Sequence, residues 1–252
     1  MPKLFQAPKL KVKRAEQHIA DLKAQIIAYV QRKPYRLVLE TDTPEKPDEK
    51  SVVVRVSEPI PCDFPAYIGD AIHNLRASLD LLACELVRLS GKSDKSVYFP
   101  FAESGQDLEI MIKKRRIDRA APDVVDIIRA LKPYRGGNDA LRALHDLDIM
   151  DKHSLLIPVA YYVGEPGAVI IGHNRVHTSW FPLEDGYKPA AITGVWPGNI
   201  EFNPDIDLPV EICFGNGQPF DGEPVVATLY KLVRLTDGII QTLEAHIRRG
   251  NP

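Results

Sequence analysis

The chain of 252 residues is 44% hydrophobic and 26% charged, which is typical of a folded globular protein and excludes a chain disordered throughout. Its formal net charge of -2 at pH 7 argues against a surface built as a whole to hold nucleic acid, although a local basic patch stays open. No apolar stretch approaches the about 20 residues of a membrane-spanning helix, and the first residues lack a signal-peptide core. The three cysteines lack C-x-x-C spacing, so we expect no disulfide framework, no thiolate zinc site and a cytoplasmic location without a membrane partner.

The first third of the chain predicts two helices flanking a hairpin. Apolar residues recur at spacings of three and four over 8–32, which predicts an amphipathic helix. The runs "YRLVLE" and "SVVVRV" predict strands within 35–57, separated by the charged, proline-containing loop "TDTPEKPDEK". Residues 66–89 carry the longest leucine and isoleucine stripe and end just before Gly91, so they predict the central helix.

The remainder predicts further helices, then strands, then a last helix. Helices are expected over 106–116, 122–131 and 138–152, the last capped by Asn138 or Asp139. Between 155 and 214, short apolar runs separated by Gly, Pro and Asp predict an antiparallel β-meander. Helical spacing returns over 224–249.

Helical segments on both sides of the β-rich stretch predict an α+β fold, with a bundle of long helices packed beside an antiparallel meander. We expect one interlocked domain over 1–252, with helical parts at 8–32, 66–152 and 224–249 and β parts at 35–57 and 155–214.

Two helices carry polar side chains next to their apolar stripes. A helical projection of 138–152 puts Ala140, Leu144, Leu147 and Met150 on the buried face, with Asp151 among them and Asp148 at its edge. On the central helix, three polar residues form a row beside the leucines: His73, Arg76 and Asp80. A buried carboxylate needs a partner, so we expect Arg76 to bridge Asp80 and Asp151. Four further residues are expected around this bridge: His73, His145, Asp148 and His153.

Three interpretations of this cluster stay open. It is a structural network that fixes the packing of two helices, or a metal-free acid/base site in which His153 or His73 is the base and Arg76 stabilises an anion. The third is a metal site. Its candidate ligands are His73, His145, Asp148, Asp151 and His153. The guanidinium of Arg76 would repel a cation, so we expect no bound metal and no cofactor.

The motifs "GDAIHNLRASLDLLACEL" and "LHDLDIMDKHSLLIPV" resemble a bacterial and phage family with N-L-R-x-x-L-D and D-K-H signatures. The match covers about 40 of the 252 residues and implies no established activity. An N-L-R-bearing helix in a helical bundle is also similar to the HEPN superfamily, which includes metal-free RNases and non-catalytic nucleic-acid-associated proteins. The HEPN signature places a histidine after its arginine, where this chain has Leu81, Leu82 and Ala83. A HEPN-like chain would therefore have lost that active site or built one from His153.

The basic run "IKKRRIDR" is the candidate for phosphate contacts, through Lys113, Lys114, Arg115 and Arg116, although a solvated helix face is the plainer interpretation. Three further polar residues, His173, Arg175 and His177, alternate along a predicted strand and would share one face.

The sequence thus favours a non-enzymatic binding or interaction module. A HEPN-like metal-free ribonuclease or nucleic-acid-associated defence protein and a metal-dependent hydrolase are the alternatives. A homo-oligomer is also compatible with the sequence.

Overall fold

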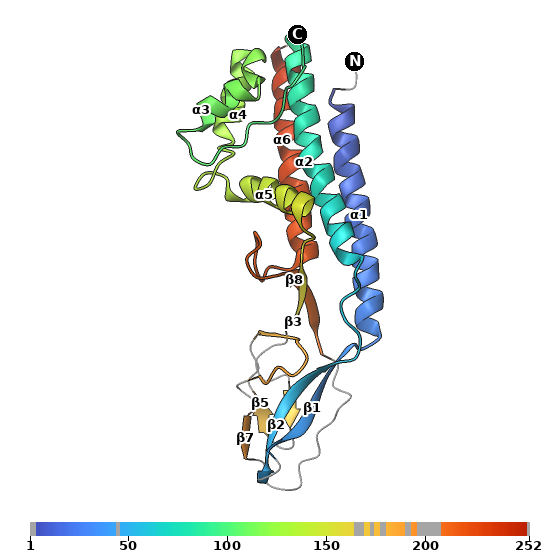
Figure 1. Cartoon of the computed structure of the whole chain (residues 1–252). Coiled ribbons are helices and arrows are strands. Elements are labelled where there is room, and N and C mark those ends of the chain that lie inside the picture. Colours follow the sequence, from blue (N-terminus) through green and yellow to red (C-terminus); the bar gives the residue numbers. More distant parts are fainter. Residues whose placement is uncertain are drawn as a thin grey trace.

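The computed structural model describes residues 4–43, 46–163, 169–171, 174–176, 180–189, 193–195 and 208–250. Its frame is a bundle of three long helices, α1 (Gln6–Gln31), α2 (Phe64–Leu89) and α6 (Val225–Gly250), which run side by side (Figure 1). The predicted long helices over 8–32, 66–89 and 224–249 are confirmed within two residues at each end. Two helices from the first part of the chain and one from its end therefore share one core.

The bundle forms because each long helix buries one apolar stripe. Ile19 and Leu22 of α1, Leu75 and Leu79 of α2 and Ile240 of α6 are all fully buried. Stripes at this spacing face one another when helices pack lengthwise, and burial of each large side chain contributes roughly 2 kcal/mol.

The shorter helices lie on one side of the bundle (Figure 1). α5 (Asp139–His153) packs against α2, and Asn138 caps its first turn by accepting a hydrogen bond from Leu141 N. α4 (Pro122–Ala130) begins at the predicted proline. The helix predicted over 106–116 is shorter, because α3 (Leu108–Lys114) ends before Arg116, which has a positive φ of 60°, and a 3-10 turn η1 (Ile117–Arg119) follows.

The predicted hairpin extends from the far end of the bundle (Figure 1). β1 (Tyr35–Thr43) and β2 (Lys46–Val56) pair antiparallel, with Tyr35 opposite Val56. Both strands continue into the segment predicted as a loop, so the expected long loop was wrong. Backbone pairing of Thr41 with Lys50 and of Thr43 with Lys46 extends the ladder into this segment.

The later strands pair antiparallel, as predicted, but their order is not that of a meander. β3 (Pro158–Tyr162) lies between β6 (Phe181–Pro182) and β8 (Val210–Phe214). β7 (Thr193–Val195) joins the edge of the first hairpin at β2. The short strands β4 (Val169–Ile171) and β5 (Asn174–Val176) pair with each other. The pairing of distant strands depends on how the whole chain packs. The periodicity of apolar residues along one strand does not determine its partner.

The structure thus confirms the α+β class, with a long-helix bundle and antiparallel sheets. Within the described ranges, no helix combines the length and apolar character needed to cross a bilayer.

Candidate functional site

Arg76 on α2 lies at the centre of the predicted cluster and is 7% exposed. Its Nη1 is 2.6 Å from Asp80 Oδ1, an ion pair one helical turn away that lacks the alignment of a hydrogen bond. Its Nε donates to His145 Nδ1 at 3.2 Å, and its guanidinium lies over the Phe101 ring, 4.6 Å from the centroid. We call Arg76, Asp80, Phe101 and His145 the inner cluster.

His145 belongs to the inner cluster through both its ring and its nitrogen. Its ring stacks on Phe101 at a centroid distance of 4.5 Å and an interplanar angle of 4°. Burial, together with the positive charges of Arg76 and Arg142, lowers the pKa of His145 to about 4. The imidazole is therefore neutral at pH 7 and accepts the hydrogen bond from Arg76, so it is tied to a structural contact.

Asp80 links the inner cluster to the segment that carries Phe101. Its Oδ1 accepts a hydrogen bond from Phe99 N at 2.8 Å. Phe99 and Phe101 are buried and lie 5.1 Å apart between ring centroids. The inner cluster therefore joins α2, α5 and residues 99–101.

The expected bridge from Arg76 to Asp80 is confirmed, but the bridge to Asp151 is wrong. The buried face of α5 runs through Leu141, Leu144 and Asp148, whereas Ala140 is exposed and Asp151 is only partly buried. The projection took the small apolar Ala140 as part of the stripe. Packing on α2 uses the face that begins one residue later, which turns Asp148 inward.

Asp148 is consequently the buried carboxylate of α5, with its side chain 5% exposed. It lies 3.1 Å from His73 Nδ1 and is also paired with Lys152, one turn further along α5. His73 is 54% exposed, so the carboxylate orients the ring while its other nitrogen is not used by this contact.

Asp151 lies beside this pair and packs against the backbone of Gly69 on α2, where an added Cβ would overlap its carboxylate. Burial raises the pKa of Asp151, and the charges of Asp148 and Asp70 raise it further. We call His73, Asp148, Asp151 and Lys152 the outer cluster. His153, at the last position of α5, is exposed.

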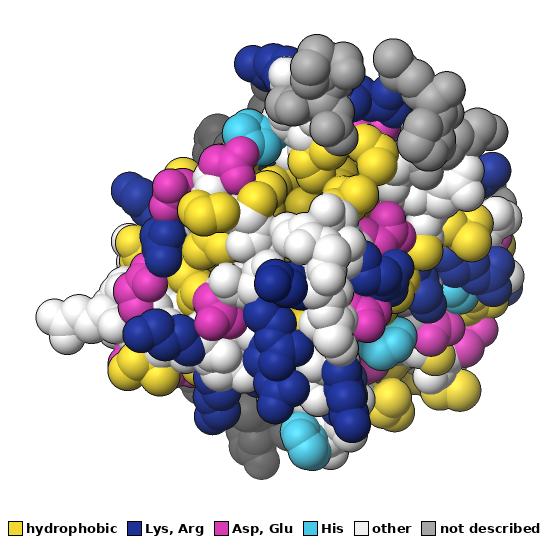
Figure 2. Space-filling view, turned by 90° about the horizontal axis from the view of Figure 1, so that it is seen from above, with side chains coloured by type: hydrophobic (Ala, Val, Ile, Leu, Met, Phe, Trp, Pro, Cys, Tyr) yellow, Lys and Arg dark blue, Asp and Glu magenta, His cyan; other side chains and the backbone are white. Residues whose placement is uncertain are grey.

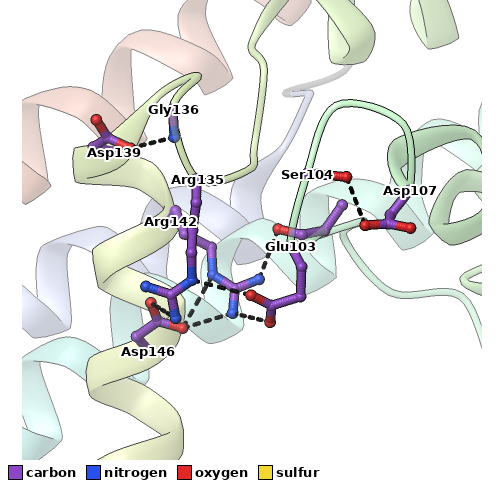
Figure 3. A network of polar contacts seen from close by, with 9 residues as sticks. Glu103, Ser104, Asp107, Arg135, Gly136, Asp139, Arg142 and Asp146 are labelled. Carbon is purple, nitrogen blue, oxygen red and sulfur yellow. Dashed lines mark hydrogen bonds and ion pairs between the residues drawn. The ribbon is translucent and has the colours of Figure 1, made fainter.

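A second polar network, which the sequence analysis missed, surrounds Arg142 on the same helix (Figure 3). Arg142 donates to Ala102 O at 2.8 Å, to Glu103 Oε1 at 2.7 Å and to Asp146 Oδ1 at 2.8 Å. Arg135 pairs with Glu103 and Asp146 as well, so two arginines share two carboxylates. The spacing of Arg142 and Asp146 was a sequence signal for one ion pair, but Glu103 comes from a distant segment that only folding brings there.

The described surface has cavities lined by residues outside the inner and outer clusters. One of about 710 Å³ lies between α5 and the loop 215–222 and is lined by Met150, Phe220 and members of the Arg142 network. A cavity of about 470 Å³ lies between α1 and the end of α6, and one of about 450 Å³ lies near Leu89. Among the described residues, no group of three or more His, Cys, Asp or Glu side chains is arranged to hold a metal.

The predicted phosphate-binding run is partly occupied by internal contacts. Arg115 lies over the Tyr98 ring, 5.6 Å from its centroid, and Arg116 donates to Lys95 O at 3.4 Å. Lys113 and Lys114 are exposed on α3. At the end of the molecule that carries both termini, Figure 2 shows lysines and arginines interspersed with acidic and apolar side chains.

Of the three polar residues predicted on one strand, His173 and His177 lie outside the described residues, as does the side chain of Arg175.

Comparisons of the chain with family models, with curated proteins and with solved structures found no match.

Proposed function

We propose that the protein is a non-enzymatic binding module whose inner cluster is structural. The observation that carries this proposal is the closure of the inner cluster. Arg76 and His145, the two groups best suited to stabilise charge or move a proton, are directed at Asp80, at Phe101 and at each other. A substrate would have to displace Phe101, which is 3% exposed, to reach the guanidinium.

The experiment that tests this proposal is an RNA-cleavage assay on the purified chain. A mixed panel of structured and single-stranded RNAs is incubated with the protein, in EDTA and separately with Mg²⁺, Mn²⁺ or Zn²⁺. We expect no cleavage above buffer in either condition. Cleavage in EDTA would replace the proposal with a metal-free nuclease, and cleavage only with a metal would replace it with a metal-dependent hydrolase.

The metal-free acid/base enzyme is the second candidate, and the outer cluster favours it. The pair of Asp148 and His73 resembles an oriented general base, and the raised pKa of Asp151 suits an acid that keeps its proton to a higher pH. If the parent cleaves RNA in EDTA, His73→Gln is expected to abolish cleavage and His153→Gln to leave it unchanged. The comparison separates His73, which Asp148 orients, from His153, which has no such carboxylate partner among the described residues.

A nucleic-acid partner at Lys113 and Lys114 is the other alternative within the binding class. Filter binding of RNA by the parent and by the double variant Lys113→Ala/Lys114→Ala tests it, because loss of two phosphate contacts lowers both affinity and its dependence on salt. Equal binding by the two proteins would exclude this surface.

A further inference from the structure

The sheet β6–β3–β8 has one buried face. Its other face buries Cys213 opposite Val159 and is partly exposed around Tyr161, and we call this exposed part the open face. Side chains alternate between the faces of a strand, so Ala160 and Tyr162 of β3 point into the core, where they are 5% and 1% exposed. Tyr161 and Val159 point to the other face and are only partly buried. The strands β3 and β8 run together below the helical bundle (Figure 1).

Two aromatic rings stack on the open face. The Tyr161 ring lies 5.5 Å from the Trp180 ring between centroids, with an interplanar angle of 30°. Trp180 comes two residues before Pro182, which pairs with Tyr161 across the strands. Trp180 is 49% exposed, so the stacked pair still offers aromatic surface to a ligand.

A carboxylate lies next to this pair. Glu211 of β8 is directly opposite Tyr161 in the register, and residues opposite each other in an antiparallel pair have neighbouring side chains. Glu211 is partly buried, and this burial raises its pKa. Among the described residues, its carboxylate has no hydrogen bond and no ion pair. A partly buried carboxylate without a partner is costly, and an incoming cation would remove that cost.

Among the described residues, two further carboxylates act on Tyr161. Asp221 and Glu184 both raise the pKa of Tyr161 through their charges, after the larger effect of burial. Such surroundings attract a cation and oppose a phosphate group. The faces of tryptophan and tyrosine rings attract a cation in addition.

We propose that Tyr161, Trp180 and Glu211 form a binding site for a guanidinium group, presented by an arginine side chain of a protein partner. The planar guanidinium stacks on an aromatic ring and pairs with a carboxylate at the same time, which an ammonium does less well. A partner protein rather than free arginine is the occupant, because an open sheet face encloses too little of a small ligand. This inference rests on the proposed binding function and names the chemistry of its partner.

The test measures binding of fluorescein-labelled hexapeptides by anisotropy. The probe is Gly-Arg-Gly-Arg-Gly-Arg, and two controls replace arginine with citrulline, its neutral isostere, or with lysine. We expect saturable binding of the arginine peptide, at least tenfold weaker binding of the citrulline peptide, and intermediate binding of the lysine peptide.

Matched variants locate the site. Glu211→Gln is expected to weaken binding of the arginine peptide at least fivefold, whereas Glu16→Gln removes the same charge from the exposed surface of α1 and should change little. Trp180→Ala is expected to weaken binding at least fivefold, whereas Tyr98→Ala removes another exposed aromatic ring and should not. Melting curves establish whether each variant is folded. If Trp180→Ala does not fold, the comparison of Glu211→Gln with the parent tests the site.

Several results would overturn the assignment. Equal binding of the arginine and citrulline peptides excludes a charged ligand, and equal binding of arginine and lysine peptides excludes guanidinium recognition. No binding, or binding unaffected by Glu211→Gln, excludes the site. Binding of a ten-nucleotide oligouridylate that Trp180→Ala abolishes would assign the aromatic pair to a base instead. None of these results produces RNA cleavage, so failure of this site is distinguishable from failure of the proposed function.

Discussion

The guanidinium of Arg76 meets side chains from three segments: Asp80 on its own helix, His145 on α5 and Phe101 before α3. A buried ion pair of this kind adds little compared with an apolar replacement of both partners, because both charges lose their hydration. Removal of one partner is different, since it leaves the other charge without compensation. The role of Arg76 is therefore measured by the loss of stability when Asp80 is left without its cation.

Arg76→Ala is expected to lower the free energy of unfolding by about 3 kcal/mol, because Asp80 would lose its cation and Phe101 its stacked guanidinium. His153→Ala is the matched control on the neighbouring helix and should change stability by no more than about 0.5 kcal/mol, since the side chain is exposed. Urea denaturation of the three proteins measures both effects. A change below 0.5 kcal/mol for Arg76→Ala would show that the inner cluster is not structural.

The pKa of His145 predicts a pH dependence of stability. The folded chain holds this pKa at about 4, below the ordinary value of 6.5, so the unfolded chain binds the proton more readily. The stability associated with a neutral His145 is present above pH 6.5 and is lost as the pH falls toward 4. The loss should be about 2 kcal/mol, after allowance for screening by solvent.

His145→Gln is the variant that tests this pH dependence, because its carbonyl can accept the hydrogen bond from Arg76 but does not titrate. We expect a smaller loss of stability between pH 7 and pH 4 than in the parent, measured by urea denaturation at each pH. His153→Gln removes an exposed histidine and should keep the parent's dependence. Parallel curves for the parent and His145→Gln would contradict the assigned pKa.

At the scale of elements, the close approach of α5 to α2 depends on a residue without a side chain. Gly69 is buried in the middle of the first half of α2, and the Asp151 carboxylate occupies the place that a Cβ would take. Gly238 of α6 is the contrasting case, because a Cβ there would meet no atom within 4 Å. A side chain at Gly69 would thus overlap a neighbouring residue, whereas a side chain at Gly238 has room.

Gly238→Ala is expected to stabilise the protein by about 0.5 to 1 kcal/mol, because alanine restricts the unfolded chain and fits an exposed helix. Gly69→Ala is expected to destabilise by about 1 to 3 kcal/mol, because Asp151 must move. In an Asp151→Ala background the same substitution should become stabilising. Thermal or urea unfolding of the parent, Gly69→Ala, Asp151→Ala and the double variant measures this double-mutant cycle. Additive effects of Gly69→Ala and Asp151→Ala on the free energy of unfolding would refute the contact.

At the scale of the whole molecule, the two ends of the chain meet in the bundle, and both lie at one end of the molecule (Figure 1). α1 and α6 contact each other, and Lys9 is paired with Glu244. α6 also contacts α2 and buries Leu229, Leu232 and Leu243. The core is therefore assembled from segments more than 200 residues apart.

A chain that ends at Phe214 is expected not to fold, because removal of α6 exposes the apolar stripes of α1 and α2 together. Circular dichroism should show reduced helix content and no cooperative melting transition. A chain that ends at Gly250 keeps α6 and should melt like the parent. Cooperative melting of the shorter chain would contradict the prediction of one interlocked domain over 1–252.

The sequence alone is enough to predict the long helices, their ends to within two residues and the α+β class, because apolar spacing is a local property of the chain. It also determined the pair of Arg76 and Asp80, since residues four apart on a helix are neighbours. The burial of Asp148 rather than Asp151 could not be predicted in this way, because the packed face of α5 is set by its contact with α2. The same holds for the strand order, for Glu103 beside Arg142 and for Glu211 beside Tyr161, whose partners lie far apart in sequence. Such contacts form wherever the apolar faces of the whole fold bring two segments together, and no local spacing encodes that choice.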